Sequence, residues 1–190
     1  MLRLAAFVLV LLALSGAPAA ASPVLVPQAP GASPLLTSGR ASPAALKLLS
    51  GSVLQEVNRA RVARGLRPLR PARSLAVSAR RHSAQMGLRG FFAHESADGT
   101  PFWRRIERFY VDDGFRSWEV GENIFWQSSG RLAGISVVRS WLASPGHRAN
   151  ILSGSWREAG VGAVSVPSAP GVYRGAPVTI VTVDFGERRR

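Results

Sequence analysis

Apolar residues recur at helical spacing in three segments of the chain. The first predicted helix starts at a capping-box pattern, Ser52 and Gln55, and ends at Gly65, which can adopt the left-handed conformation that closes a helix. Its apolar stripe consists of Val53, Val57 and Ala60. We expect the ordered domain to begin near Pro43 or Ser52, and we assign residues 46–187 to it.

A second helix is predicted from Ser74 to Gly87. Its apolar stripe is formed by residues spaced four, three and four apart, namely Leu75, Ala79, His82 and Met86. His82 therefore falls on the core face of this helix or at its margin. A single histidine in such a position is more often a hydrogen-bonded structural residue than a ligand, so we expect His82 to lie outside any functional cluster.

The third helix is predicted from Ala133 to Ser144, with apolar positions at Ile135, Val138 and Leu142. It ends in a Ser-Pro-Gly turn because Pro145 cannot continue the helix. We expect this turn to place His147 at the rim of a cleft. Two polar residues beyond it are interpreted as structural: Asn150 can bridge backbone groups, and Arg148 can reach carbonyl groups or a carboxylate such as Glu158. Ile151 and Leu152 anchor the loop in the core.

Three other segments have the pattern of strands. Residues 123–127 form the first, with Glu122 at its entrance, and residues 161–166 and 178–185 form two more. In the last segment, Val181, Val183 and Phe185 share one face and Thr182 and Asp184 the other. Because the helices come mostly before the strands, we predict an α+β fold with a mostly antiparallel sheet. His94 precedes a turn signal in a loop, where the simplest expectation is an exposed residue.

The ends of the chain have a different composition. Residues 1–21 combine Arg3, an apolar stretch and the small-residue site Ala19-Ala20-Ala21, which is typical of a secretory signal peptide. Residues 22–45 are rich in Pro, Ala and Ser and form a predicted linker. Residues 188–190 form a predicted basic tail. We expect a secreted protein, extracellular or periplasmic, with no transmembrane segment in its mature form.

Composition excludes several kinds of chemistry. The 190-residue chain has no cysteine, so it has no disulfide, thiolate metal site or cysteine nucleophile. Its formal net charge is +13, and Lys47 is the only lysine. The charge could mark contact with an anionic envelope surface, but arginines spread along the chain favour an ordinary solvated surface. Nucleic acid is not expected, since the basic runs are not interleaved with aromatic residues.

Several motifs occur together in one order along the chain: "LAVSARRHSAQM", "FFAHESADGTPFWRRI", "VGENI", "VVRSWLASPGHRANIL" and "VTVDFG". Over residues 53–186 they resemble the bacterial branch of the CAP superfamily, named for cysteine-rich secretory proteins, antigen 5 and pathogenesis-related proteins. The pairing of "GEN" with "SPGHRANIL" is the most specific part of this resemblance. The resemblance implies an α-β-α sandwich, in which helices cover both faces of a central antiparallel sheet.

The resemblance also implies a cleft lined by two histidines and two glutamates, which bind a divalent metal, usually zinc, in some members. By motif, three of these positions fall on His94, Glu122 and His147. The fourth departs from the pattern, because Ser144 stands where the second glutamate is expected. Two imidazoles and one carboxylate suit zinc with an open coordination position. Alternatively, Glu122 and His147 belong to a hydrogen-bonded network that holds the cleft together without metal.

Three functional classes remain open. The first, which we favour, is a non-catalytic binding module whose cleft takes a metal, small ligand, lipid, peptide or envelope fragment. The second is a metal-dependent, protease-like hydrolase that uses His94, His147 and Glu122, with Glu122 as ligand or general base. The third is a structural envelope protein that acts through its basic surface. No nucleophile elbow or phosphate-binding glycine loop is visible, and we expect a monomer.

Overall fold

The computed structural model describes residues 41–128 and 130–189. The predicted signal peptide and most of the predicted linker lie outside these residues. The described helices are α1 (Pro43–Val62), α2 (Arg73–Arg89), α3 (Phe102–Glu107), α4 (Gly134–Ala143) and α5 (Pro145–Leu152), with a short 3₁₀ turn, η1 (Gly171–Tyr173). The described strands are β1 (Arg70–Pro71), β2 (Ser117–Ser128), β3 (Glu158–Val166) and β4 (Val178–Arg189).

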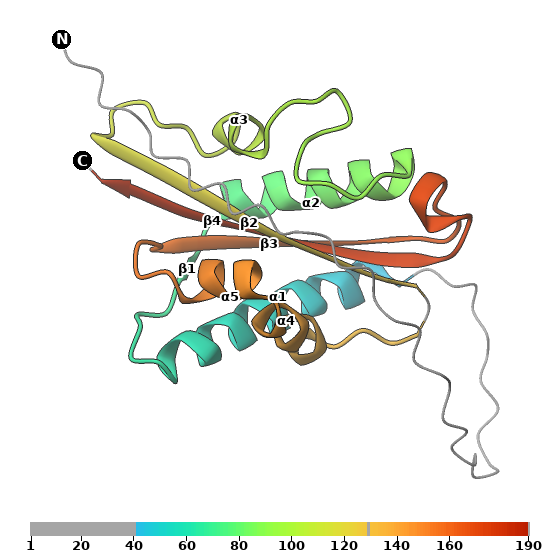
Figure 1. Cartoon of the computed structure of the whole chain (residues 1–190), viewed down its shortest axis with the longest axis horizontal. Helices are drawn as coiled ribbons and strands as arrows, with labels where there is room; N and C mark the ends of the chain where they lie inside the picture. Colours follow the sequence, from blue (N-terminus) through green and yellow to red (C-terminus); the bar gives the residue numbers. More distant parts are fainter. Residues whose placement is uncertain (1–40, 129, 190) are drawn as a thin grey trace.

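The four strands form one sheet between two layers of helices. Their order is β1-β3-β4-β2, so the long strand β2 lies at one edge. Both β2 and β3 pair with β4 in antiparallel register, and only the short β1 is parallel to its neighbour. Helices α2 and α3 cover one face, and α1, α4 and α5 cover the other (Figure 1). The predicted α+β sandwich with a mostly antiparallel sheet is confirmed.

Alternation along the strands assigns each side chain to a layer. Val181, Val183 and Phe185 of β4 are buried in the larger core cluster with α1 and α4, as predicted. Thr182 of β4 lies on the opposite face, where its hydroxyl is 2.8 Å from that of Ser83 in α2. The two faces therefore have separate interiors, and the one beneath α2 contains buried polar groups.

Helix α2 packs unusually close to the sheet. Two glycines of β3, Gly160 and Gly162, face the helix, and a Cβ atom at Gly162 would lie 2.1 Å from the backbone nitrogen of Arg80. Its predicted stripe is confirmed, since Leu75, Ala79, His82 and Met86 are all fully buried. The helix ends at Gly90 with φ 74°, which is a left-handed C-terminal cap.

The boundaries of α1 and β4 differ from those predicted. Helix α1 begins at Pro43, because the Ser42 hydroxyl accepts a hydrogen bond from the Ala45 backbone and proline fits the first helical position. The predicted linker therefore ends before residue 45. At the other end, Arg188 and Arg189 belong to β4, where they pair with Trp118 and Ser117. They are not a tail.

The region after α4 also differs from the prediction. Pro145 ends α4 but also starts α5, because its missing N–H falls where a helix has no internal partner for it. His147 thus lies in a helix rather than a loop. In α4 the buried face consists of Val137, Val138 and Trp141, whereas Ile135 is exposed. The short helix α3 was not predicted.

Candidate functional site

The candidate site lies around the middle of β2. The prediction that Glu122 lies at the entrance of this strand is wrong. Glu122 lies in the interior of β2, opposite Asp184 of β4. Val120 and Ile124, two residues to either side, pack into core clusters that include Leu75 and Met86 of α2. By alternation Glu122 points toward the same layer, where its side chain is 1% exposed.

Two donors hold the Glu122 carboxylate. His94, in the loop between α2 and α3, contacts Oε1 through Nδ1 at 2.8 Å. Arg105 of α3 donates from Nη2 to Oε2 at 2.6 Å and to the His94 carbonyl at 3.1 Å. Since a carboxylate only accepts hydrogen bonds, the His94 proton lies on Nδ1 in this contact. His94 remains half-exposed, whereas Arg105 is buried.

This contact set keeps Glu122 ionised despite its burial. Burial by itself raises the pKa of Glu122, but the charge of Arg105 and the hydrogen bond from His94 lower it overall. Asp184, directly across the sheet, shows the opposite behaviour. Burial raises the pKa of Asp184 well above its usual range, and the negative charge of Glu122 raises it further. Of the two neighbouring carboxyl groups, Glu122 is the one whose charged form is stabilised by the guanidinium of Arg105.

His82 lies beneath the same carboxylate. Its Nε2 atom is 4.0 Å from Glu122 Oε1 and 2.9 Å from the carbonyl oxygen of Ala93, the residue before His94. Burial lowers the pKa of His82 to about 4, so the ring is neutral and donates to Ala93. The expectation of a hydrogen-bonded structural histidine is met, but the expectation that it lies outside the cluster is wrong. It supports the loop that carries His94.

His147 reaches β2 from the other layer. Its backbone carbonyl accepts a hydrogen bond from Asn123, the residue after Glu122. Asn150, one turn further along α5, donates to the Glu122 carbonyl and to the Asn123 side chain. These bonds fix α5 against the edge strand. Burial lowers the pKa of His147, and the charge of His94 lowers it further, so the two imidazoles interact electrostatically around β2.

The three residues expected to share a cleft are therefore not all in direct contact. Glu122 and His94 are in direct contact, whereas His147 is held through its own backbone carbonyl by the side chain of Asn123, the next residue in β2. The structural role expected for Asn150 is confirmed in part, since its side chain bonds one backbone carbonyl and one side chain, and it does so from a helix rather than a loop. Arg148 donates to the carbonyl of Leu142, which confirms the first of the two contacts expected for it. The suggested contact of Arg148 with Glu158 is wrong, because Glu158 interacts with Tyr110, Arg70 and Arg188 instead.

Arg105, Asp184 and Asn123 are members of the site that the sequence pattern did not identify. Asn123 belongs to the "GEN" motif, so its position beside Glu122 was the one available signal. Arg105 was one of several arginines, and only the fold brings it to Glu122. In the described ranges, no three His, Cys, Asp or Glu side chains are placed to hold one metal ion.

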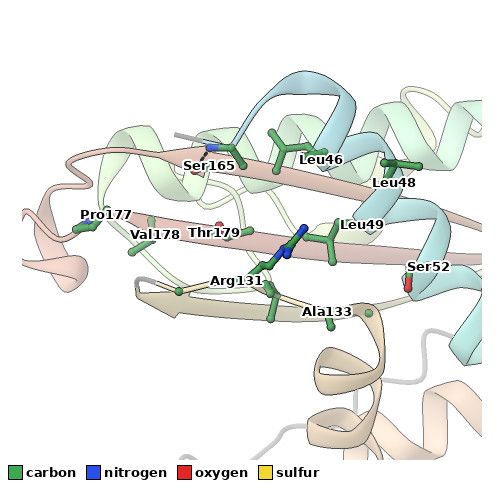
Figure 2. Close-up of a pocket in the computed structure, with 15 residues that line it drawn as sticks. Leu46, Leu48, Leu49, Ser52, Arg131, Ala133, Ser165, Pro177, Val178 and Thr179 are labelled. Atoms are coloured by element: carbon green, nitrogen blue, oxygen red, sulfur yellow. Dashed lines mark hydrogen bonds between the residues drawn. The ribbon is translucent and has the colours of Figure 1, made fainter. Parts of the chain in front are cut away.

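A separate groove of about 610 Å³ lies beyond the end of β2. Leu46, Leu48 and Leu49 of α1 line one side, and Arg131 extends toward them from the segment after β2 (Figure 2). Val178 and Thr179 at the start of β4 also line it. None of His94, Glu122 and His147 contributes to this groove, so the polar site and the apolar groove are distinct features of the surface.

Comparison with known proteins identifies relatives over most of the chain. The family model described as CAP, cysteine-rich secretory protein family, matches residues 54–185. The uncharacterized protein YkwD of Bacillus subtilis (strain 168) is 31% identical over 147 residues, which are 77% of this chain and 54% of YkwD. This chain therefore spans about half the length of that relative.

Solved structures show the same arrangement of helices and strands. An extracellular protein containing an SCP domain from Bacillus anthracis is 28% identical, with a TM-score of 0.56 over 80% of this chain and 45% of that chain. An outer surface protein of Borrelia burgdorferi is 20% identical, with a TM-score of 0.54 over 77% of this chain and 95% of that chain. The second likeness concerns the fold alone.

Proposed function

This chain belongs to the CAP family of cysteine-rich secretory proteins, and from that premise we propose that it is a secreted binding module. In this proposal, a cleft around β2 that includes His94, Glu122 and His147 takes a ligand without turning it over. The ligand is a small molecule, lipid, peptide or envelope fragment.

One observation carries the non-catalytic part of this proposal. Both oxygens of the Glu122 carboxylate already accept hydrogen bonds, one from His94 and one from Arg105. A general base must present a free lone pair to the proton that it abstracts, and a metal ligand must present one to the ion. The Glu122 side chain is 1% exposed, so its remaining lone pairs are not open to a substrate or an ion from solvent, and its main role is to hold the surrounding residues together. The hydrolase alternative lacks an accessible carboxylate.

The residues present do not fit the expected zinc ion. Glu122 is shared between two donors, the buried Arg105 guanidinium lies against it, and Ser144 replaces the fourth family ligand. His94 and His147 alone are a small set for zinc, which usually has three or four protein ligands. We therefore assign no step to a metal.

Secretion is supported by the relatives and by the sequence of residues 1–21. The Bacillus anthracis structure is described as that of an extracellular protein, and its SCP domain is similar to this chain. No helix among residues 41–128 and 130–189 combines the length and apolar character needed to cross a bilayer. The ligand or envelope component is therefore met outside the cytoplasm, where the chain acts as a monomer.

The substitution Glu122→Gln distinguishes a binding module from a metal-dependent hydrolase. We expect the variant to lose about 3 kcal/mol of unfolding free energy, because the substitution leaves the buried Arg105 without its counter-charge. Urea denaturation measures this loss. Glu119→Gln is the matched control, since Glu119 lies in the same strand but is only half-buried, and we expect it to change the free energy by less than about 0.5 kcal/mol.

The same proteins are then screened for hydrolysis of peptide, ester and glycan substrates, with and without added zinc. We expect no turnover by the wild type. Zinc-dependent hydrolysis that disappears in Glu122→Gln, with an unchanged unfolding free energy, would contradict the proposal and favour the hydrolase.

A further inference from the structure

The negative charge of the cleft is already balanced by a cation that the chain itself supplies. Arg105 is 6% exposed, and its Nη2 atom lies 2.6 Å from Glu122 Oε2. The Glu122 carboxylate therefore faces a guanidinium at hydrogen-bonding distance, and its charge is compensated without a divalent ion.

Arg105 also contacts the loop that carries the first histidine. The same Nη2 atom donates to the backbone carbonyl of His94 at 3.1 Å, while the His94 ring donates through Nδ1 to Glu122. A single guanidinium thus holds the carboxylate and the backbone of the histidine beside it. The contact leaves Nε2 as the His94 ring nitrogen available to a ligand.

Arg105 reaches this position because α3 is firmly seated. Ile106, the next residue, is fully buried in a cluster with Leu75 and Tyr110. The backbone of Arg105 is hydrogen-bonded to Pro101, which precedes the helix. The backbone of Arg105 is therefore fixed by the packing of α3, which places the side chain next to Glu122.

We propose that Arg105 is the resident cation of this cleft: it occupies the counter-charge position on Glu122 and prevents a divalent metal from binding there. The proposal rests on the cleft described above as the binding site. Arg105 thereby determines whether the site accepts a metal ion. A neutral side chain at this position would remove the ion pair with Glu122 and leave an uncompensated carboxylate beside His94. Such a site attracts zinc.

Zinc binding to four proteins tests this role. Equilibrium dialysis at pH 7 measures zinc bound by the wild type, Arg105→Met, Arg105→Lys and the double variant Arg105→Met/His94→Ala. We expect Arg105→Met to bind zinc at least about 10-fold more tightly than the wild type, the size of effect typical of groups adjacent to metal ligands. Arg105→Lys retains the charge and should behave like the wild type. The double variant should lose the gain.

Folding is monitored by circular dichroism, because Arg105→Met leaves a buried charge unpaired. If this variant folds only when zinc is present, the proposal is supported, since zinc then replaces the guanidinium. Arg105→Gln serves as a second neutral variant that can still donate a hydrogen bond to Glu122. A folded Arg105→Met or Arg105→Gln with no gain in zinc affinity would overturn the proposal.

Zinc binding by the wild type alone can also overturn the proposal. One zinc ion bound per wild-type chain, and lost in His94→Ala, would show that Arg105 does not exclude metal, whatever the variants do. This outcome leaves the binding-module function intact as long as no hydrolysis is found. Conversely, hydrolysis by a zinc-free wild type would refute the module and leave the role of Arg105 standing.

Discussion

Glu122 is ionised inside the protein because its neighbours stabilise the charge more than burial opposes it. A carboxylate that is 1% exposed loses its hydration, and that loss favours the neutral acid. The guanidinium of Arg105 and the ring of His94 reverse this preference. Asp184 has no such partner with a full charge at contact distance, and its pKa shifts upward. Two carboxyl groups opposite each other in adjacent strands thus have pKa values shifted in opposite directions.

His82 should make the protein sensitive to acid. The folded ring has a pKa of about 4, against 6.5 for an unperturbed histidine, so the unfolded chain takes up a proton first as the pH falls. The two pKa values differ by about 2.5, which corresponds to roughly 3 kcal/mol of stability lost between pH 6.5 and pH 4. The nearby charges of Glu122, Arg105 and His94 are included in this shift.

Urea denaturation at pH 7, 6, 5 and 4 measures this dependence on the wild type and on His82→Gln. Glutamine can still donate to the Ala93 carbonyl but does not titrate, so the variant should lose less stability over this range. Equal slopes for the two proteins would show that His82 does not cause the acid sensitivity.

The sequence predicted individual residues best where a local pattern was sufficient. The buried stripe of α2, with His82 on it, follows from spacing within one helix. The contact of Arg105 with Glu122 joins α3 to β2, and no spacing rule relates the two residues. His94 and His147 were placed near Glu122 by the family resemblance alone. The hydrogen bonds of these two histidines could not be predicted, because they depend on which side chains the fold brings into contact with Glu122.

At the scale of elements, the closeness of α2 to the sheet positions the polar cluster. Gly160 and Gly162 of β3 have no side chain on the face toward α2, so the helix backbone lies almost directly on the strand. This brings Ser83 within hydrogen-bonding distance of Thr182 and His82 within 4.0 Å of Glu122. A helix farther from the sheet would leave these groups without partners.

Gly162→Ala should therefore be strongly destabilising. The added Cβ would lie 2.1 Å from the Arg80 nitrogen, which belongs to the helix backbone and cannot rotate away. We expect a loss of about 3 kcal/mol of unfolding free energy. Gly51→Ala is the matched control, because a Cβ at this position in α1 meets nothing within 4 Å and alanine favours the helix. A loss of less than about 1 kcal/mol in Gly162→Ala would contradict this account.

Elements that depend on one strong local signal were predicted, and those that depend on neighbours were not. The strand at residues 178–185 and the helix at Ser74 follow from periodicity. Helix α5 was missed because a proline was interpreted as a stop, although proline is also favoured at the first helical position. The two-residue β1 exists only through its parallel pairing with β3. Such pairing leaves no trace in local sequence.

At the scale of the whole molecule, the site joins the two helical layers around the edge of the sheet. Helix α3, which carries Arg105, lies in the layer of α2, whereas α5, which carries His147, lies in the layer of α1 and α4 (Figure 1). His94 and Arg105 contact Glu122 of β2, and His147 contacts the next residue, Asn123. An edge strand permits this because, among residues 41–128 and 130–189, no further strand pairs with its outer side. Some of the arginines that give the chain its high net charge are buried and structural. Arg61, for example, donates hydrogen bonds to the carbonyls of Ile151 and Ser153.

The start of the folded domain gives a test of the whole assembly. A chain that begins at Ser52, the capping-box position, lacks the first nine residues of α1, including the buried Leu49 and the half-buried Leu46. We expect it to be less stable than a chain that begins at Ala41 by roughly 3 kcal/mol, from lost apolar burial. In the longer chain, Leu49→Ala should cost about 2 kcal/mol, whereas Leu48→Ala, at a side chain 76% exposed, should cost less than about 0.5 kcal/mol. Urea denaturation of all four proteins decides between the two starts, and equal stability of the two chains would show that residues 41–51 add nothing to the core.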